Sequence, residues 1–248
     1  MSPARPILWL LVFTGTFGNA ADDGLPGRFA VGFFSTNSGE LPPGWQPLEF
    51  RGIPQHTQYT VVRDGEVWVL RALSDSSASG LIYPLQVDLR QYPFLHWRWK
   101  VQNVLEKGDL TRRSGDDYPA RLYVVFDYEP QSLSFFDRAI HRIARLTYGD
   151  LPGRALNYIW ANRTPREKSH STPSPITDYS RLLVCRSPPE DALGVWFEEE
   201  RNVFEDYQLA FGADPPQVIG IGLMTDTDNT GESAIAHYGD ITFLREPN

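Results

Sequence analysis

The chain has 248 residues, a formal net charge of −8 at pH 7 and one cysteine. Nucleic acids and anionic lipid headgroups are bound through basic patches, so this acidic balance argues against both as partners. A lone Cys185 excludes an intramolecular disulfide, and the five scattered histidines include no pair at zinc-ligand spacing.

Residues 1–20 have the pattern of a secretory signal peptide. Arg5 is the lone charge, Ile7–Phe17 is apolar, and small residues end the segment at Gly18-Asn19-Ala20. The apolar run is too short for the roughly 20 residues that span a bilayer, and no later run reaches that length. We therefore expect an exported protein, periplasmic or extracellular, in which residues 21–248 form a single domain.

The rest of the chain alternates strand-like runs with turns. Tyr59–Val62 and Val67–Leu70 flank Asp64-Gly65, a pair that favours a tight β-hairpin turn. In Phe94–Val101 the apolar and polar residues alternate, as in a half-buried strand. The other predicted strands are Leu81–Leu85, Leu122–Phe126, Leu156–Trp160, Arg181–Cys185, Val218–Met224 and Ile235–Leu244.

Two segments have apolar residues at helical spacing, Ser134–Tyr148 and Arg201–Phe211, and each is followed by a glycine. Strands separated by turns and interrupted by two short helices are typical of a mainly β protein. We predict a two-sheet antiparallel β-sandwich, jelly-roll or galactose-binding-like, with one or two inserted helices.

Several longer motifs resemble domain-of-unknown-function family 3047, whose members are exported bacterial proteins without an assigned activity. The motifs are 95–100, 115–121, 200–207 and 224–230, and the likeness extends from about Phe34 to Phe243. A looser resemblance links Val87–Leu95, and Ile219–Gly222 with Tyr238–Ile241, to jelly-roll carbohydrate-binding modules. This second resemblance implies a binding fold without implying a particular ligand.

Two acid-rich turns, residues 115–121 and 225–231, contain the candidate site. Carboxylates crowded at strand ends require a cation among them, whether an Arg side chain, a metal ion or a ligand. The candidate ligand-binding residues in these turns are Asp116, Asp117, Arg121, Asp226, Asp228 and Asn229. A buried structural ion pair around Arg121 is an equally open interpretation.

The second turn also has oxygen-bearing residues at the spacing of a calcium loop. Asp226, Asp228 and Thr230 occupy its positions 1, 3 and 5, but His237 stands at position 12, where an EF-hand has Glu. A calcium site of another kind would use these three residues, with Asp240, Asp116 or Asp117 supplying further oxygens. The alternative is a polar hairpin whose side chains cap the turn, with no cofactor.

Aromatic residues suggest the class of ligand. Trp160 precedes a polar loop, and an exposed indole ring there would stack on a sugar. For the polar stripe His96, Arg98 and Lys100 we favour a solvated sheet face. We therefore expect a non-catalytic protein that binds a saccharide or cell-envelope glycan.

Two alternatives stay open. One is a glycan hydrolase or lyase that uses two of these carboxylates, which would have to lie about 5–9.5 Å apart. The other is a structural envelope protein in which both acidic turns only stabilise the fold.

Overall fold

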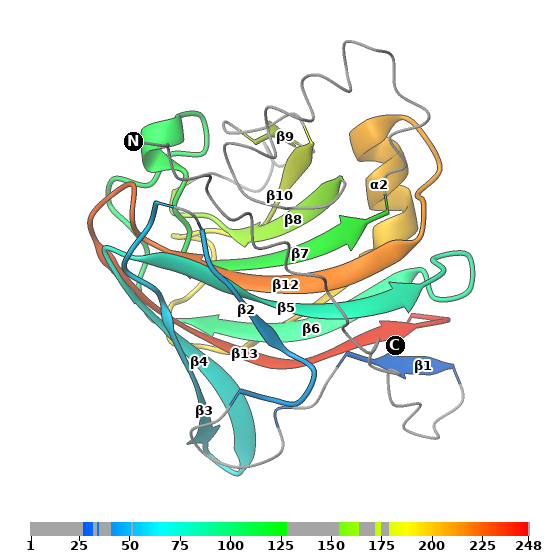
Figure 1. Ribbon diagram of the computed structural model, residues 1–248, viewed down its shortest axis with the longest axis horizontal. Helices are drawn as coiled ribbons and strands as arrows, with labels where there is room; N and C mark the ends of the chain where they lie inside the picture. The colour runs from blue at the N-terminus through cyan, green and yellow to red at the C-terminus, as the bar shows by residue number, and fades with distance from the viewer. Residues whose placement is uncertain are drawn as a thin grey trace, which may run out of the picture.

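The structure is a computed structural model that describes residues 27–31, 34, 41–50, 52–127, 154–163, 172–174 and 179–247. Its described part is built from two layers of β-sheet, with one α-helix at an end of the sandwich (Figure 1). The mainly β prediction is confirmed. Two predicted segments lie outside the described residues, namely the signal peptide at 1–20 and the helix at Ser134–Tyr148.

The first sheet has six strands, and all its pairs are antiparallel. Its order is β11-β6-β13-β4-β3, and β1 pairs with the C-terminal end of the long strand β13. The strands are β1 (Arg28–Ala30), β3 (Gln58–Asp64), β4 (Val67–Asp75), β6 (Phe94–Val101), β11 (Phe197–Asn202) and β13 (Ser233–Leu244).

The second sheet has seven strands in the order β2-β5-β12-β7-β8-β10-β9. They are β2 (Gln46–Leu48), β5 (Ala78–Val87), β7 (Ala120–Phe126), β8 (Ala155–Trp160), β9 (Thr172–Pro173), β10 (Ser180–Arg186) and β12 (Val218–Asp226). Contrary to the expected antiparallel sandwich, β8 and β10 are parallel. The connection at 161–179 is long enough for the return crossing that a parallel pair requires.

The local predictions agree well with these elements. Gly65 has φ 65° in the turn that joins β3 to β4, where Asp64 pairs with Val67. On β6, Leu95, Trp97, Trp99 and Val101 are all buried, as the alternation of that segment predicts. Strand β7, which contains the predicted strand Leu122–Phe126, lies between β12 and β8.

An aromatic core joins the two sheets. Trp97 and Trp99 of β6 pack edge to face, with ring centroids 5.5 Å apart, and contact Tyr158 and Trp160 of β8 at 5.2 and 6.0 Å. Burial of such large rings is among the strongest stabilising contributions in a sandwich core.

The helix α2 (Val203–Phe211) confirms the second predicted helix, although it begins two residues later because Arg201 and Asn202 belong to β11. The Asn202 side chain accepts a hydrogen bond from the Glu205 amide, and Gly212 ends the helix with φ 68°. The helix packs against β6, β8 and β11. No helix within the described ranges is long and apolar enough to cross a membrane.

Candidate functional site

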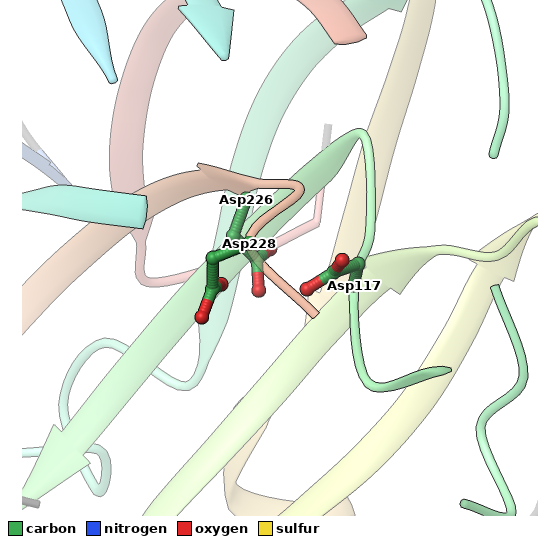
Figure 2. A group of neighbouring side chains, drawn as sticks. All are labelled: Asp117, Asp226 and Asp228. Atoms are coloured by element: carbon green, nitrogen blue, oxygen red, sulfur yellow. The ribbon is translucent and has the colours of Figure 1, made fainter. Parts of the chain in front are cut away.

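The two acid-rich turns meet at one end of the seven-stranded sheet. Strand β12 ends where the antiparallel β7 begins, so that Met224 lies opposite Arg121. Figure 2 shows the consequence: Asp226 and Asp228, from the end of β12 and the turn after it, lie close to Asp117, from the segment before β7. The fold therefore brings together residues more than one hundred positions apart in the chain.

Arg121 is the cation at the centre of these turns, and its side chain is buried. Its Nε donates to Asp226 Oδ1 at 2.8 Å, and its Nη2 donates to Asp226 Oδ2 and to the Asp116 backbone carbonyl. The Asp116 carboxylate lies 3.7 Å from Nη1, and the guanidinium carbon is 4.4 Å from the centre of the Tyr118 ring. This bidentate geometry is the strongest form of ion pair between side chains.

Asp117 links the two turns through its side chain. Its carboxylate accepts hydrogen bonds from the Asn229 side chain at 3.0 Å and from the Thr230 amide at 2.6 Å. In the opposite direction, the Tyr118 amide donates to Asp226 at 3.3 Å. Asp116, Asp117, Arg121 and Asp226 are thus buried parts of a brace, whereas Asp228 is half-buried and Asn229 is exposed.

The brace contains more carboxylates than cations. Burial raises the pKa of Asp226 well above its ordinary value although Arg121 opposes the shift, and burial also raises the pKa values of Asp116 and Asp228. Asp117, Asp226 and Asp228 each offer one oxygen within 4.8 Å of the others, which is the geometry of a partial cation site.

Only part of the predicted calcium set is found in that group. Thr230 contributes its amide to Asp117, and its hydroxyl bonds to the Thr227 carbonyl at 3.4 Å. Asp240 is not in the group, because seven residues of extended strand from Ser233 carry it about 24 Å along β13. There it accepts a hydrogen bond from the Phe34 amide at 3.4 Å.

Trp160 is also placed differently from the prediction. Its ring is fully buried between Trp99 and Phe197, at centroid distances of 6.0 and 5.5 Å. The end of β8 turns this side chain towards the space between the sheets, so it presents no face on which a sugar could stack.

A second cluster lies on the outer face of the six-stranded sheet, and the sequence did not predict it. We call it the sheet-face cluster, and it consists of Asp64, Arg71, Arg98, Lys100, Trp196 and His237. His237 of β13 stands opposite Arg71 of β4 on one side and Lys100 of β6 on the other. These three side chains thus form a row across three adjacent strands.

Trp196, which precedes β11, completes this cluster. Its Nε1 donates to Asp64 Oδ2 at 2.6 Å, and Lys100 Nζ donates to the same oxygen. The Arg98 guanidinium and the Lys100 ammonium lie 4.8 and 5.1 Å from the centre of the Trp196 ring. The sequence predicts a solvated sheet face at Arg98 and Lys100. The structure instead places the half-buried Trp196 ring over both side chains.

One ring nitrogen of His237, the buried Nδ1, forms no hydrogen bond within the described residues. Burial, and then the positive charges of Lys100 and Arg71, lowers the pKa of the ring to about 4. The imidazole is therefore neutral at pH 7.

The two sheets and their buried interface define a β-sandwich protein. The chain belongs to the family described as "Protein of unknown function (DUF3047)", whose model matches residues 43–242. No curated protein matches the chain.

Three solved structures resemble the fold distantly. A β-1,2-glucanase from Parabacteroides distasonis is 10% identical, with a TM-score of 0.45, over 89% of this chain and 25% of that one. The K2 cleaved adhesin domain of Lys-gingipain is 12% identical, with a TM-score of 0.40, over 88% and 99%. A lectin from Bauhinia forficata in complex with GalNAc is 11% identical, with a TM-score of 0.34, over 88% and 97%. The chain spans only a quarter of the glucanase, and we draw no conclusion about ligand or activity from these likenesses.

Proposed function

We propose that the protein is an exported, non-catalytic saccharide-binding protein whose ligand lies on the outer face of the six-stranded sheet, against Trp196. The observation that carries this proposal is a half-buried indole ring surrounded by hydrogen-bonding side chains on the outer face of the six-stranded sheet. Saccharide sites combine an aromatic surface, on which the sugar ring stacks, with a few placed polar groups that bind hydroxyls.

The tryptophans of the described chain differ in how far they can serve this role. Trp45, Trp97, Trp99 and Trp160 are buried, whereas Trp68 and Trp196 are half-buried. Trp68 has the single cation Arg63 over its ring at 5.2 Å. Trp196 has the donors Arg98 and Lys100 against its ring, and the Asp64 carboxylate accepts from its Nε1.

In this proposal the acidic turns have a different task. Asp116, Asp117, Arg121 and Asp226 are buried and bonded to one another or to backbone, so they hold the loop end of the sandwich together. Asp228 and Asn229 are the members of the predicted site that a ligand could reach there.

The test is depletion of the purified protein from solution by immobilised polysaccharides of bacterial and plant origin. We expect selective depletion by one class of polymer, lost in Trp196→Ala and kept in Trp68→Ala, the matched control. Thermal unfolding of both variants verifies that they are folded. Depletion that survives Trp196→Ala, or none by any polymer, would contradict the site or the function respectively. Release of new reducing ends by the wild type would contradict the non-catalytic part.

A further inference from the structure

The sheet-face cluster carries positive charge that the described chain does not neutralise. Three other guanidinium groups of the described chain are paired with carboxylates: Arg121 with Asp226, Arg186 with Glu199 and Asp191, and Arg201 with Asp206. Arg71 and Arg98 have no ion pair or hydrogen bond to a carboxylate within the described residues. Arg71 and Arg98, both half-buried, therefore have guanidinium N–H groups without a carboxylate partner among the described residues.

The nearest carboxylates are already used or point to other partners. Asp64 is bound by Lys100 and by Trp196, so its charge is compensated. Glu198 is opposite Arg98 in the strand register, but its carboxylate is 3.8 Å from His96 Nε2 and is 74% exposed. A planar anion supplied by a ligand would fill the open positions of both guanidinium groups.

The backbone of β13 is shaped to let Arg98 cross it. A Cβ atom placed on Gly239 would overlap Nε, Cγ and Cδ of Arg98 at less than 3.0 Å, so only glycine permits the side chain to lie there. Gly239 sits in the register shift between Tyr238 and Ile241, where the ladder with β6 is interrupted. Arg98 is therefore directed across the strand that carries His237, on whose other side β4 carries Arg71.

We propose that the bound saccharide is acidic and that Arg71 and Arg98 hold its carboxylate groups across β13, the strand that lies between them. The proposal rests on the saccharide-binding function and specifies its ligand class. Guanidinium groups match carboxylates through paired N–H···O bonds, which a neutral sugar cannot supply. The Trp196 ring then provides the stacking surface of the same site.

The experiment compares one polyuronate with the same polymer after chemical reduction of its carboxylates to primary alcohols, using the full protein at low and high salt. We expect the polyuronate to bind and the reduced polymer to bind at least tenfold more weakly. Arg71→Gln and Arg98→Gln should each weaken polyuronate binding about tenfold to a hundredfold, and high salt should weaken it too. Arg63→Gln, which alters an exposed arginine on the neighbouring edge strand, should leave it unchanged.

The outcomes separate the two proposals. Equal binding of both polymers, lost in Trp196→Ala, would overturn the acidic ligand and keep the saccharide-binding function. Binding to a sulfated polymer but not to the polyuronate would overturn the carboxylate class. Binding to no polymer by a folded protein would overturn both proposals.

Discussion

Replacing Arg121 by methionine tests whether the acidic turns are a brace that depends on one buried cation. The substitution keeps an unbranched side chain of similar length and removes the one cation that, among the described residues, forms ion pairs with Asp226 and Asp116. Loss of one partner from a buried ion pair costs about 3–5 kcal/mol, because the remaining charge stays buried without compensation. For a chain of this size that loss corresponds to a fall in melting temperature of about 6–20 °C.

The pH dependence of the same variant supplies a second readout. Burial already raises the pKa of Asp226 in the folded protein, and Arg121 is the main influence that opposes the rise. A carboxyl group with a raised folded-state pKa loses stability as the pH rises from the unfolded value of 3.8 towards the folded value. Arg121→Met should therefore lie closest to the wild type at low pH and fall furthest behind it at neutral pH.

Thermal unfolding followed by circular dichroism at several pH values measures both effects. Arg90→Met is the matched control. Arg90 is 67% exposed and its Nη2 lies as far as 4.0 Å from the Asp214 carboxylate, so this ion pair contributes little to the free energy of unfolding. The double variant with Asp226→Leu should recover much of the loss, since it removes the stranded carboxylate. A loss in Arg121→Met no larger than that in Arg90→Met would refute the reasoning.

Three further predictions follow from single contacts. Gly115→Ala should cost about 1–3 kcal/mol, because its Cβ would lie 2.7 Å from the Asp109 backbone nitrogen, and denaturant unfolding measures it. His237 has a folded pKa of about 4 against 6.5 unfolded, so it should add stability as the pH rises from 4 to 6.5. For this half-exposed ring we expect about 1–2 kcal/mol after solvent screening, visible as the wild type minus His237→Asn. Gly239→Ala should displace Arg98 and weaken polyuronate binding about tenfold, measured by titration calorimetry on a variant that thermal unfolding shows to be folded.

Each of these has a control or a contrary result. Gly220→Ala matches Gly115→Ala, because its nearest neighbours lie at 3.5 Å, an ordinary contact distance. A Gly115→Ala variant as stable as Gly220→Ala would mean that the turn adapts freely. Parallel stability curves for the wild type and His237→Asn would contradict the lowered pKa. Unchanged binding in Gly239→Ala would show that Arg98 does not act from its position over β13.

Local chemistry accounts for the elements that were predicted correctly. The Asp64-Gly65 turn, the alternation along 94–101 and the glycine after Phe211 each depend on residues close together in the chain. A strand of period two must bury one face, so the burial of Trp97 and Trp99 follows from the pattern alone. The acidic turns gave a local clue as well, since crowded carboxylates at strand ends need a cation, but their meeting depends on the pairing of β12 with β7.

Tertiary structure decided everything that depends on which strands become neighbours. Trp160 precedes a polar loop in sequence, yet the packing of the two sheets encloses its ring completely. Asp240 is 12 residues from Asp228, but it lies within β13, and the extended residues that precede it carry it away from the acidic turn. Trp196, His237 and Arg98 come from three different strands or their flanks, and no pattern within any one of them marks a common site. Strand register is set by long-range pairing, and only that pairing brings Trp196, Arg98 and His237 together on one face of the sheet.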